Sequence, residues 1–355
     1  MRVSAMASLL ASFVGASRWA HVGRVEVAGL CGVALFLLVL VWGRHNNARV
    51  ARAVDAGLAR GVGGEYVLEG RLVADRQTRR EGWWSGRRHV VGFHAVLELV
   101  PRQDVLKWVV GWVMPRRDDV VTLDVFLRDG GAVPCVAALY GRRRVKAVRR
   151  ELFDLATFCA ERGVTPSTDD SWPPEGAVFF GEPGAALQDL LGARSAFVAA
   201  LAAAGGAVPR VYLKLLRCVH VTDQNGVQGD AGEGGEDALR GLRGVPAGSR
   251  CVVRVEAILP RRVGEVETFV ESLASAAHAL ADAVATYRMD PGEAAARRKA
   301  RAAVEEQRKR AEQKRRAAAI HREKQNKMTA EEARRQAKRK QDRKLRKGAK
   351  QVKIM

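Results

Sequence analysis

Catalytic and metal-binding motifs are what this sequence most clearly lacks. Its seven histidines show no HExxH or other metal-ligand spacing, and no Gly-x-Ser-x-Gly or phosphate-loop pattern is present. His89 and His94 are five residues apart on an expected strand, so they point to opposite faces. These absences argue against an enzyme, a metal site and a cofactor.

Signals of a lumenal or secreted domain are also lacking. The five cysteines are odd in number and have no CxxC spacing, and none of the four asparagines begins an Asn-x-Ser/Thr sequon. The Gly-rich stretch from Asp223 to Arg250 carries acids but not the register of a calcium loop. We therefore expect reduced cysteines, a cytosolic location for most of the chain, and a loop without calcium.

Charge is distributed very unevenly along the chain. Residues 291–355 hold 24 Lys and Arg against 8 Asp and Glu, which is +16 of the formal +21. A basic segment of this density fits a polyanion such as RNA, an anionic membrane surface or an acidic protein.

The basic segment has the pattern of a helix. Asp290-Pro291-Gly292-Glu293 offers an N-cap acceptor and Pro at the first helical position. Seven of its eight acids precede a Lys or Arg by four residues, which supports an isolated helix by about 0.2–0.5 kcal/mol per pair. A second cap at Thr329 and a stop at Gly348 are further expectations.

A coiled-coil seam is missing from this helix, because most of its apolar residues are Ala. We therefore expect a charged, solvated helix that gains stability on a partner surface; a mere solvated spacer is the alternative. The candidate ribosome- or rRNA-binding side chains are the eleven bases near its end, Arg334, Arg335, Lys338, Arg339, Lys340, Arg343, Lys344, Arg346, Lys347, Lys350 and Lys353.

The longest apolar run lies near the other end. Residues 27–43 are 17 uncharged residues, about 25 Å as a helix, and residues 25–43 are predicted to cross a membrane. Trp19 and Trp42 flank the run as interfacial aromatics would. This length suits a thin bilayer such as that of the endoplasmic reticulum. A buried core helix and a signal-peptide apolar region are the alternatives.

Orientation follows from the bases around the run. Arg18 and Arg24 precede it, whereas four arginines follow it within residues 44–60, so the C-terminal side is expected in the cytosol. Residues 1–24 are then expected to be a short lumenal N-terminus, with a possible weak signal.

We call the basic C-terminal segment, residues 290–355, the arm. The sequence between the apolar run and the arm predicts an α+β domain in two halves, residues 44–165 and 166–289. In the first half, a strand is expected at Val90–Val100, a helix at Gln103–Met114, and a hairpin that pairs Val120–Leu127 with Ala132–Tyr140. Apolar residues from Val145 to Cys159 recur at 3, 4, 3, 4 spacing, which predicts one helix ending near Gly163.

In the second half, Ala185–Ala204 is expected to be a helix, and Val211–Val221 a strand that pairs with Cys251–Leu259. An apolar stripe from Leu273 to Tyr287 predicts a closing helix before the arm. A mobile loop is expected at residues 223–250.

Trp108 and Trp112 stand at i, i+4 on the expected helix Gln103–Met114 and share one face. Valines 105, 109 and 113 can fill the core from an adjacent stripe. The two Trp are therefore candidates for membrane or translocon contact, as are Trp19 and Trp42; burial of the pair in the core is the alternative.

Several collinear motifs resemble one known family. They are Trp83-Trp84-Ser85-Gly86-Arg87, Arg102-Gln103-Asp104, Phe158-Cys159, Val219-His220-Val221-Thr222-Asp223-Gln224 and the terminal Lys350-Gln351-Val352-Lys353-Ile354-Met355. From about residue 25 to the end, the chain resembles the calumin-type coiled-coil proteins of the endoplasmic reticulum membrane, which are subunits of the PAT complex.

The resemblance implies a single-pass protein with a cytosolic α+β domain and a basic helix that contacts the ribosome. Its implied partners are the 60S subunit with rRNA near the tunnel exit, the Sec61 channel, a small membrane subunit of the PAT complex and endoplasmic reticulum lipid. It implies an assisting role in the insertion and folding of multipass membrane proteins. The family's acidic lumenal segment is not matched, so calcium storage is not expected here.

One other function remains open from the residues alone. The chain could be a membrane tether or adaptor whose basic helix binds anionic lipid, acidic protein or cytoskeleton. A lipid-binding helix should show a broad apolar face, which this arm lacks beyond Leu345, so RNA is favoured.

Overall fold

The structure is a computed structural model that describes residues 24–68, 70–76, 78–102, 104, 118–128, 135–164, 172–184, 186–203, 210–223 and 249–352. It divides into two compact units, Met1–Met289 and Asp290–Met355. The first unit combines helices with an antiparallel sheet, so the predicted α+β class is confirmed.

Within the described ranges, one nine-stranded sheet runs through the first unit in the order β1-β2-β3-β4-β9-β8-β5-β7-β6. Its strands are β1 (Val73–Arg76), β2 (Arg79–Trp84), β3 (Val90–Glu98), β4 (Val120–Arg128), β5 (Ala137–Gly141), β6 (Ala160–Arg162), β7 (Ala177–Gly181), β8 (Leu216–Thr222) and β9 (Ser249–Ile258). The central strands β4 and β9 are rich in Val and largely buried, which suits strands covered on both faces.

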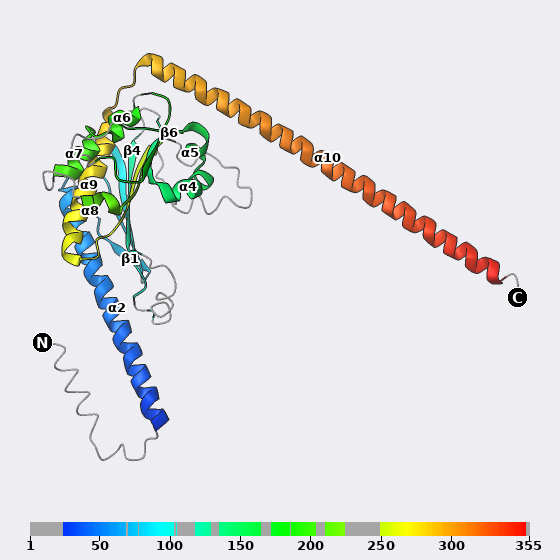
Figure 1. The fold of residues 1–355 in the computed structure, drawn as a ribbon, viewed down its shortest axis with the longest axis horizontal. Coiled ribbons are helices and arrows are strands. Elements are labelled where there is room, and N and C mark those ends of the chain that lie inside the picture. The colour runs from blue at the N-terminus through cyan, green and yellow to red at the C-terminus, as the bar shows by residue number, and fades with distance from the viewer. Residues whose placement is uncertain are drawn as a thin grey trace. The chain divides into compact units, whose positions relative to one another are not determined.

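Helices cover both faces of the sheet (Figure 1). One face carries the C-terminal half of α2 (Arg24–Val62) together with α6 (Ala186–Leu191), α7 (Ala196–Ala203), α8 (Arg210–Leu215) and α9 (Val263–Thr286). The other carries α4 (Val145–Glu151) and α5 (Phe153–Phe158), which follow the short 3-10 helix η2 (Arg142–Arg144). The second unit contains α10 (Pro291–Val352).

Two hydrophobic cores correspond to these two faces. The larger joins α2, α9 and the sheet, and includes Leu58, Phe93 and Leu273. The smaller joins α4 and α5 to β5 and β7 through Val148, Leu155 and Phe180. β5 serves both, because Ala137 and Leu139 face the larger core while Ala138 and Tyr140 face the smaller.

The hairpin predicted between Val120–Leu127 and Ala132–Tyr140 is wrong. β4 pairs with β3 and β9, whereas β5 pairs with β7 and β8, so two strands separate them. The long strand β9 forms an antiparallel ladder with β4 from Ile258 to Ser249, with one register shift between Leu127 and Arg128, and this ladder occupies the place that β5 was expected to take. The Asp-Gly turn itself lies outside the described residues.

Three other elements differ from their predictions in where they begin, end or are interrupted. The helix expected from Val145 to Gly163 is interrupted at Leu152, whose backbone is extended, and residues 160–162 pair with β7 as β6. The helix expected at Ala185–Ala204 is divided into α6 and α7, because the Ser195 hydroxyl accepts a hydrogen bond from Val198 N and begins a new helix. Residues 210–215 are helical, so the strand expected from Val211 begins at Leu216.

Other predictions are confirmed. β3 covers the strand predicted at Val90–Val100, β8 pairs with β9, and α9 is the closing helix with its apolar stripe buried. α10 is a single helix that passes through Thr329 and Gly348, so the cap and stop expected there are wrong. The helix predicted at Gln103–Met114 and most of the loop at 223–250 lie outside the described residues.

Candidate membrane contact and nucleic-acid interface

The N-terminal half of α2 presents an apolar surface. Nine of its large apolar side chains between Val27 and Trp42 are exposed by 44% to 62%, and only 6% of its most apolar window is buried. A core helix would be mostly buried, so the buried-core alternative is wrong for this window. By length and composition α2 is able to cross a membrane.

The C-terminal half of α2 belongs to the domain. Val50, Val54 and Leu58 face the larger core and are almost fully buried. Gly57 and Gly61, one turn apart, lie against α9: a Cβ added at Gly57 would be 2.5 Å from Glu267 O, and one at Gly61 would be 2.6 Å from Glu271 O. The two glycines therefore let the backbones of α2 and α9 approach closely.

A polar clamp fixes α2 to the sheet just beyond the apolar surface. Asn47 Nδ2 donates to Val100 O at 3.1 Å, and Arg102 Nη1 donates to Asn47 Oδ1 at 2.7 Å. Arg102 also forms a two-bond ion pair with Asp119, whose Oδ1 accepts from Val100 N at 2.8 Å. Asn47 is five residues, or about 8 Å, from Trp42, so the domain begins almost directly where the apolar surface ends.

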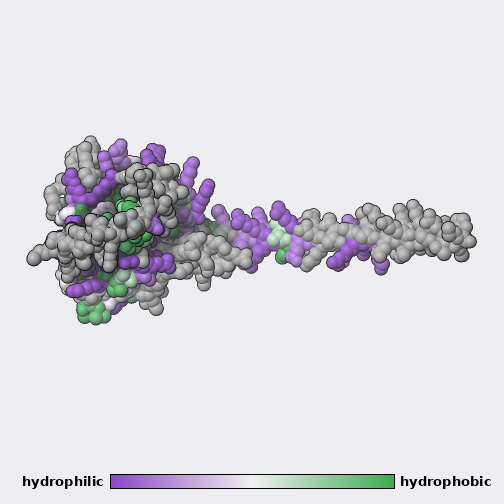
Figure 2. Space-filling model, turned by 90° about the horizontal axis from the view of Figure 1, so that it is seen from below, coloured by the Kyte–Doolittle hydropathy of each residue, from purple (hydrophilic) through white to green (hydrophobic). Residues whose placement is uncertain are grey.

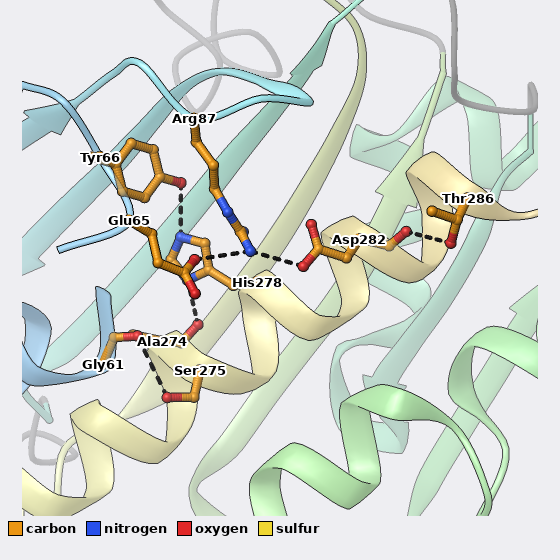
Figure 3. Close-up of polar contacts among 9 residues, drawn as sticks. All are labelled: Gly61, Glu65, Tyr66, Arg87, Ala274, Ser275, His278, Asp282 and Thr286. Atoms are coloured by element: carbon orange, nitrogen blue, oxygen red, sulfur yellow. Dashed lines mark hydrogen bonds and ion pairs between the residues drawn. The ribbon is translucent and has the colours of Figure 1, made fainter. Parts of the chain in front are cut away.

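A second polar group joins the end of α2 to α9 (Figure 3). Tyr66 and His278 share a 2.8 Å hydrogen bond at Nε2, and His278 Nδ1 lies 2.7 Å from Ala274 O. The carbonyl accepts only, so Nδ1 carries the proton and Nε2 accepts from the Tyr66 hydroxyl. Arg87 bridges Glu65 and Asp282 at 2.8 Å each.

Burial lowers the pKa of His278 to about 4, and the nearby Arg87 charge acts in the same direction. Burial raises the pKa of Tyr66. Both groups are therefore neutral at pH 7, and their contact is structural.

α10 presents a charged surface of the opposite kind. Most of its described side chains are exposed, and Figure 2 shows them as hydrophilic with one small hydrophobic spot. Glu306–Arg310 and Glu312–Arg316 form ion pairs four residues apart, as predicted for those positions. No described apolar stripe along the helix would suit a coiled coil or a lipid surface.

Comparison with known proteins identifies the family. A family model described as PAT complex subunit CCDC47 matches residues 24–353. The chain belongs to the CCDC47 family. The resemblance read from the sequence motifs is thus confirmed.

Individual relatives in the CCDC47 family are distant. A Danio rerio protein named PAT complex subunit CCDC47 is 24% identical over 150 residues, which cover 39% of this chain and 31% of the relative. The Bos taurus protein of the same name is 23% identical over 150 residues, which cover 39% of this chain and 31% of the relative. An uncharacterised Arabidopsis thaliana protein is 28% identical over 107 residues, 30% of this chain and 22% of the relative. The matched stretch thus spans less than a third of these relatives.

The structure places only some of the expected site residues of this CCDC47-family chain. Trp42 is on α2 and 58% exposed, and Arg334, Arg335 and Lys338 are exposed on α10. Residues 339–350 belong to the same helix, but their side chains lie outside the description. Trp19, Trp108, Trp112 and Lys353 lie outside the described residues altogether.

Sequence reasoning missed the clamp and the Tyr66–His278 contact. Asn47 and Arg102 are 55 residues apart and Tyr66 and His278 are 212 apart, so no local spacing connects them. The closely packed glycines had a visible signal in Gly57-x-x-x-Gly61. Among the described residues, no group of three or more His, Cys, Asp or Glu could hold a metal ion.

Proposed function

We propose that this chain is a non-enzymatic membrane-protein biogenesis factor of the endoplasmic reticulum, a PAT-type subunit with its domain in the cytosol. It binds translating ribosomes beside the Sec61 channel and assists insertion and folding of multipass membrane proteins. The observation that carries the proposal is the combination, in one CCDC47-family chain, of the exposed apolar half of α2 with the strongly basic α10.

Two features support the cytosolic orientation. Arg44, Arg49, Arg52 and Arg60 follow the apolar surface along α2. All five cysteines lie within the described residues and none of them forms a disulfide, which fits a reducing compartment.

The arm is the proposed ribosome contact, and its partner is rRNA near the tunnel exit. Its eleven bases between Arg334 and Lys353 are accompanied by one acid, Asp342. A tether or adaptor that binds anionic lipid, acidic protein or cytoskeleton is the alternative. The arm's lack of an apolar face disfavours a lipid surface, since interfacial helices bury Trp, Phe or Leu.

Trp42 and the tryptophans at 19, 108 and 112 are the proposed contacts with lipid or translocon subunits. Trp is favoured at both kinds of interface because it combines a large apolar ring with a polar N–H. A small membrane subunit of the PAT complex is the proposed partner of α2.

The test removes the most basic part of the arm. Deleting residues 329–355 is expected to reduce cosedimentation of detergent-solubilised chain with 60S subunits by roughly tenfold or more, because the phosphate contacts are lost. Membrane insertion, measured by resistance to carbonate extraction, is expected to be unchanged, since α2 is intact.

A length-matched variant separates charge from helix length. It keeps residues 329–355 but replaces the eleven bases with Gln, and it should behave like the truncated chain. Undiminished cosedimentation of either variant would contradict the ribosome proposal. Loss of binding to anionic vesicles, with ribosome binding retained, would favour the tether.

A further inference from the structure

A second basic surface lies on the domain itself, directly after β5. Six bases occur within nine residues of η2 and α4, and all six are exposed: Arg142, Arg143, Arg144, Lys146, Arg149 and Arg150. They belong to the first unit and are separate in sequence from the arm. Figure 1 shows α4 on the face of the sheet opposite α9.

Packing explains why these bases share one side. Val148 is 3% exposed and packs with Leu155 and Phe180 in the smaller core, and Val145 packs against the same cluster. The apolar side of α4 is thus occupied by the domain. Arg142, Lys146 and Arg150 recur at four-residue intervals, which places them along the outer side.

The bases differ in how far they are already neutralised. Arg144 lies 3.0 Å from Glu256, which is shared with Arg217 at 3.1 Å. Arg149 lies 3.2 Å from Glu161 and 5.1 Å from the Phe180 ring.

The remaining four form no ion pair with another described residue. They are Arg142, Arg143, Lys146 and Arg150, and we call them the α4 stripe.

The α4 stripe is unfavourable for the isolated domain. Like charges three or four residues apart on a helix repel one another and destabilise it. A polyanion bound along the outer side would remove this repulsion. Three of the four stripe residues are Arg, whose planar guanidinium binds phosphate through two hydrogen bonds and stacks on bases.

RNA fits this surface better than a lipid bilayer does. No large hydrophobic side chain between Arg142 and Glu151 is exposed, so the segment has nothing to insert between lipid chains. From Arg142 to Arg150 the stripe is about 12 to 16 Å long, enough to follow two or three phosphates of a strand.

We propose that the α4 stripe is a second RNA-binding surface, which contacts RNA phosphates independently of the arm. The inference rests on the proposed function, because it takes ribosomal RNA as the polyanion that both surfaces meet. Two contacts on separate units make the second one effectively intramolecular, so the ribosome is held more tightly than by either alone.

The test uses the full chain in nanodiscs of neutral phosphatidylcholine, with a 30-nucleotide fluorescent single-stranded RNA as the probe. The stripe variant changes Arg142, Arg143, Lys146 and Arg150 to Gln. A matched control changes Arg71, Arg76, Arg88 and Arg261 to Gln, which are exposed bases elsewhere on the domain. Each set is also made in the chain that lacks residues 329–355.

The stripe variant is expected to bind RNA roughly tenfold more weakly than the matched control, with the loss present in both backgrounds. Its log–log salt slope should be shallower by about 1.4 to 2, since two or three phosphate contacts with a single strand are removed. The melting temperature should be unchanged or slightly higher, because repulsion on α4 is relieved.

The outcomes separate the two proposals. Equal RNA binding by stripe variant and control in both backgrounds would overturn the second surface while leaving the arm untouched. Equal binding by full and truncated chains would instead overturn the arm as an RNA contact. Loss of binding to phosphatidylserine vesicles with RNA binding retained would assign the stripe to lipid and overturn the inference.

Discussion

Tyr66 and His278 show how single residues join distant parts of this chain. His278 is 4% exposed, and both of its ring nitrogens are used, one toward Ala274 O and one toward the Tyr66 hydroxyl. Protonation of His278 would put a positive charge on a buried ring near the Arg87 guanidinium. The folded chain therefore favours the neutral imidazole.

The free energy of unfolding should therefore depend on pH. The pKa of His278 is about 4 in the folded chain and near 6.5 when unfolded, so between these values only the unfolded state takes up the proton. The free energy of unfolding should then fall as pH drops, by about 2 kcal/mol between pH 7 and pH 5. For a domain of this size that is a decrease of roughly 4 to 8 °C in melting temperature.

The measurement is the melting temperature of the parent chain and of His278→Gln at pH 7 and at pH 5, with unfolding monitored by tryptophan fluorescence. The variant should lose most of the pH-dependent decrease, because Gln does not titrate. His321→Gln, at an exposed position on α10, should keep it. The same decrease in all three proteins would show that other groups cause it.

At the scale of elements, the pattern of apolar residues predicted which segments are buried better than it predicted how they pair. Val148 and Leu155 are buried as the spacing required, although two short helices replace the single one. The pairing of β4 with β9 joins residues about 130 apart, for which the local Asp-Gly signal carried no information. The candidate site could be predicted in α2 and α10, because their apolar and basic compositions are visible in the sequence. The clamp could not be predicted, because it depends on contacts between residues far apart in the sequence.

Contact between α2 and α9 gives a prediction about whole elements. Gly61→Ala would place a methyl group 2.6 Å from Glu271 O and 2.8 Å from the Ala274 Cβ, so the helices must separate. Such overpacking costs about 1 to 3 kcal/mol, which exceeds the helix-propensity gain of about 1 kcal/mol or less.

Thermal unfolding of the detergent-purified chain measures this. Gly61→Ala should melt several degrees lower than the parent. Gly264→Ala on α9 is the matched control, because no heavy atom lies within 4 Å of its added Cβ. A parent-like melting temperature for Gly61→Ala would mean that α2 and α9 adjust without cost.

For the whole molecule, the main feature is that charge and apolar surface lie in different units. Of the formal charge of +21, +16 belongs to residues 291–355, while the exposed apolar surface lies on α2. The proposed binding to RNA and the proposed attachment to lipid should therefore respond to different conditions. Salt screens the first strongly and has little effect on the second.

We expect the affinity of the full chain for 60S subunits to fall steeply between 50 and 200 mM salt. Contact with about five phosphates gives a log–log slope near −4, and the chain without residues 329–355 should give a clearly shallower slope. Carbonate-resistant membrane attachment should not change over the same range. Affinity that is independent of salt would contradict phosphate contacts.

The continuity of α2 has a mechanical consequence. Its 39 residues, about 58 Å, contain no proline and pass from the apolar surface into the core as one helix. Because the clamp at Asn47 and the close packing against α9 hold this helix to the domain, the two should move together as one body. If the membrane thins or thickens, a spanning helix changes its tilt. The sheet would then turn by the same angle, so a change in bilayer thickness would change the orientation of the domain.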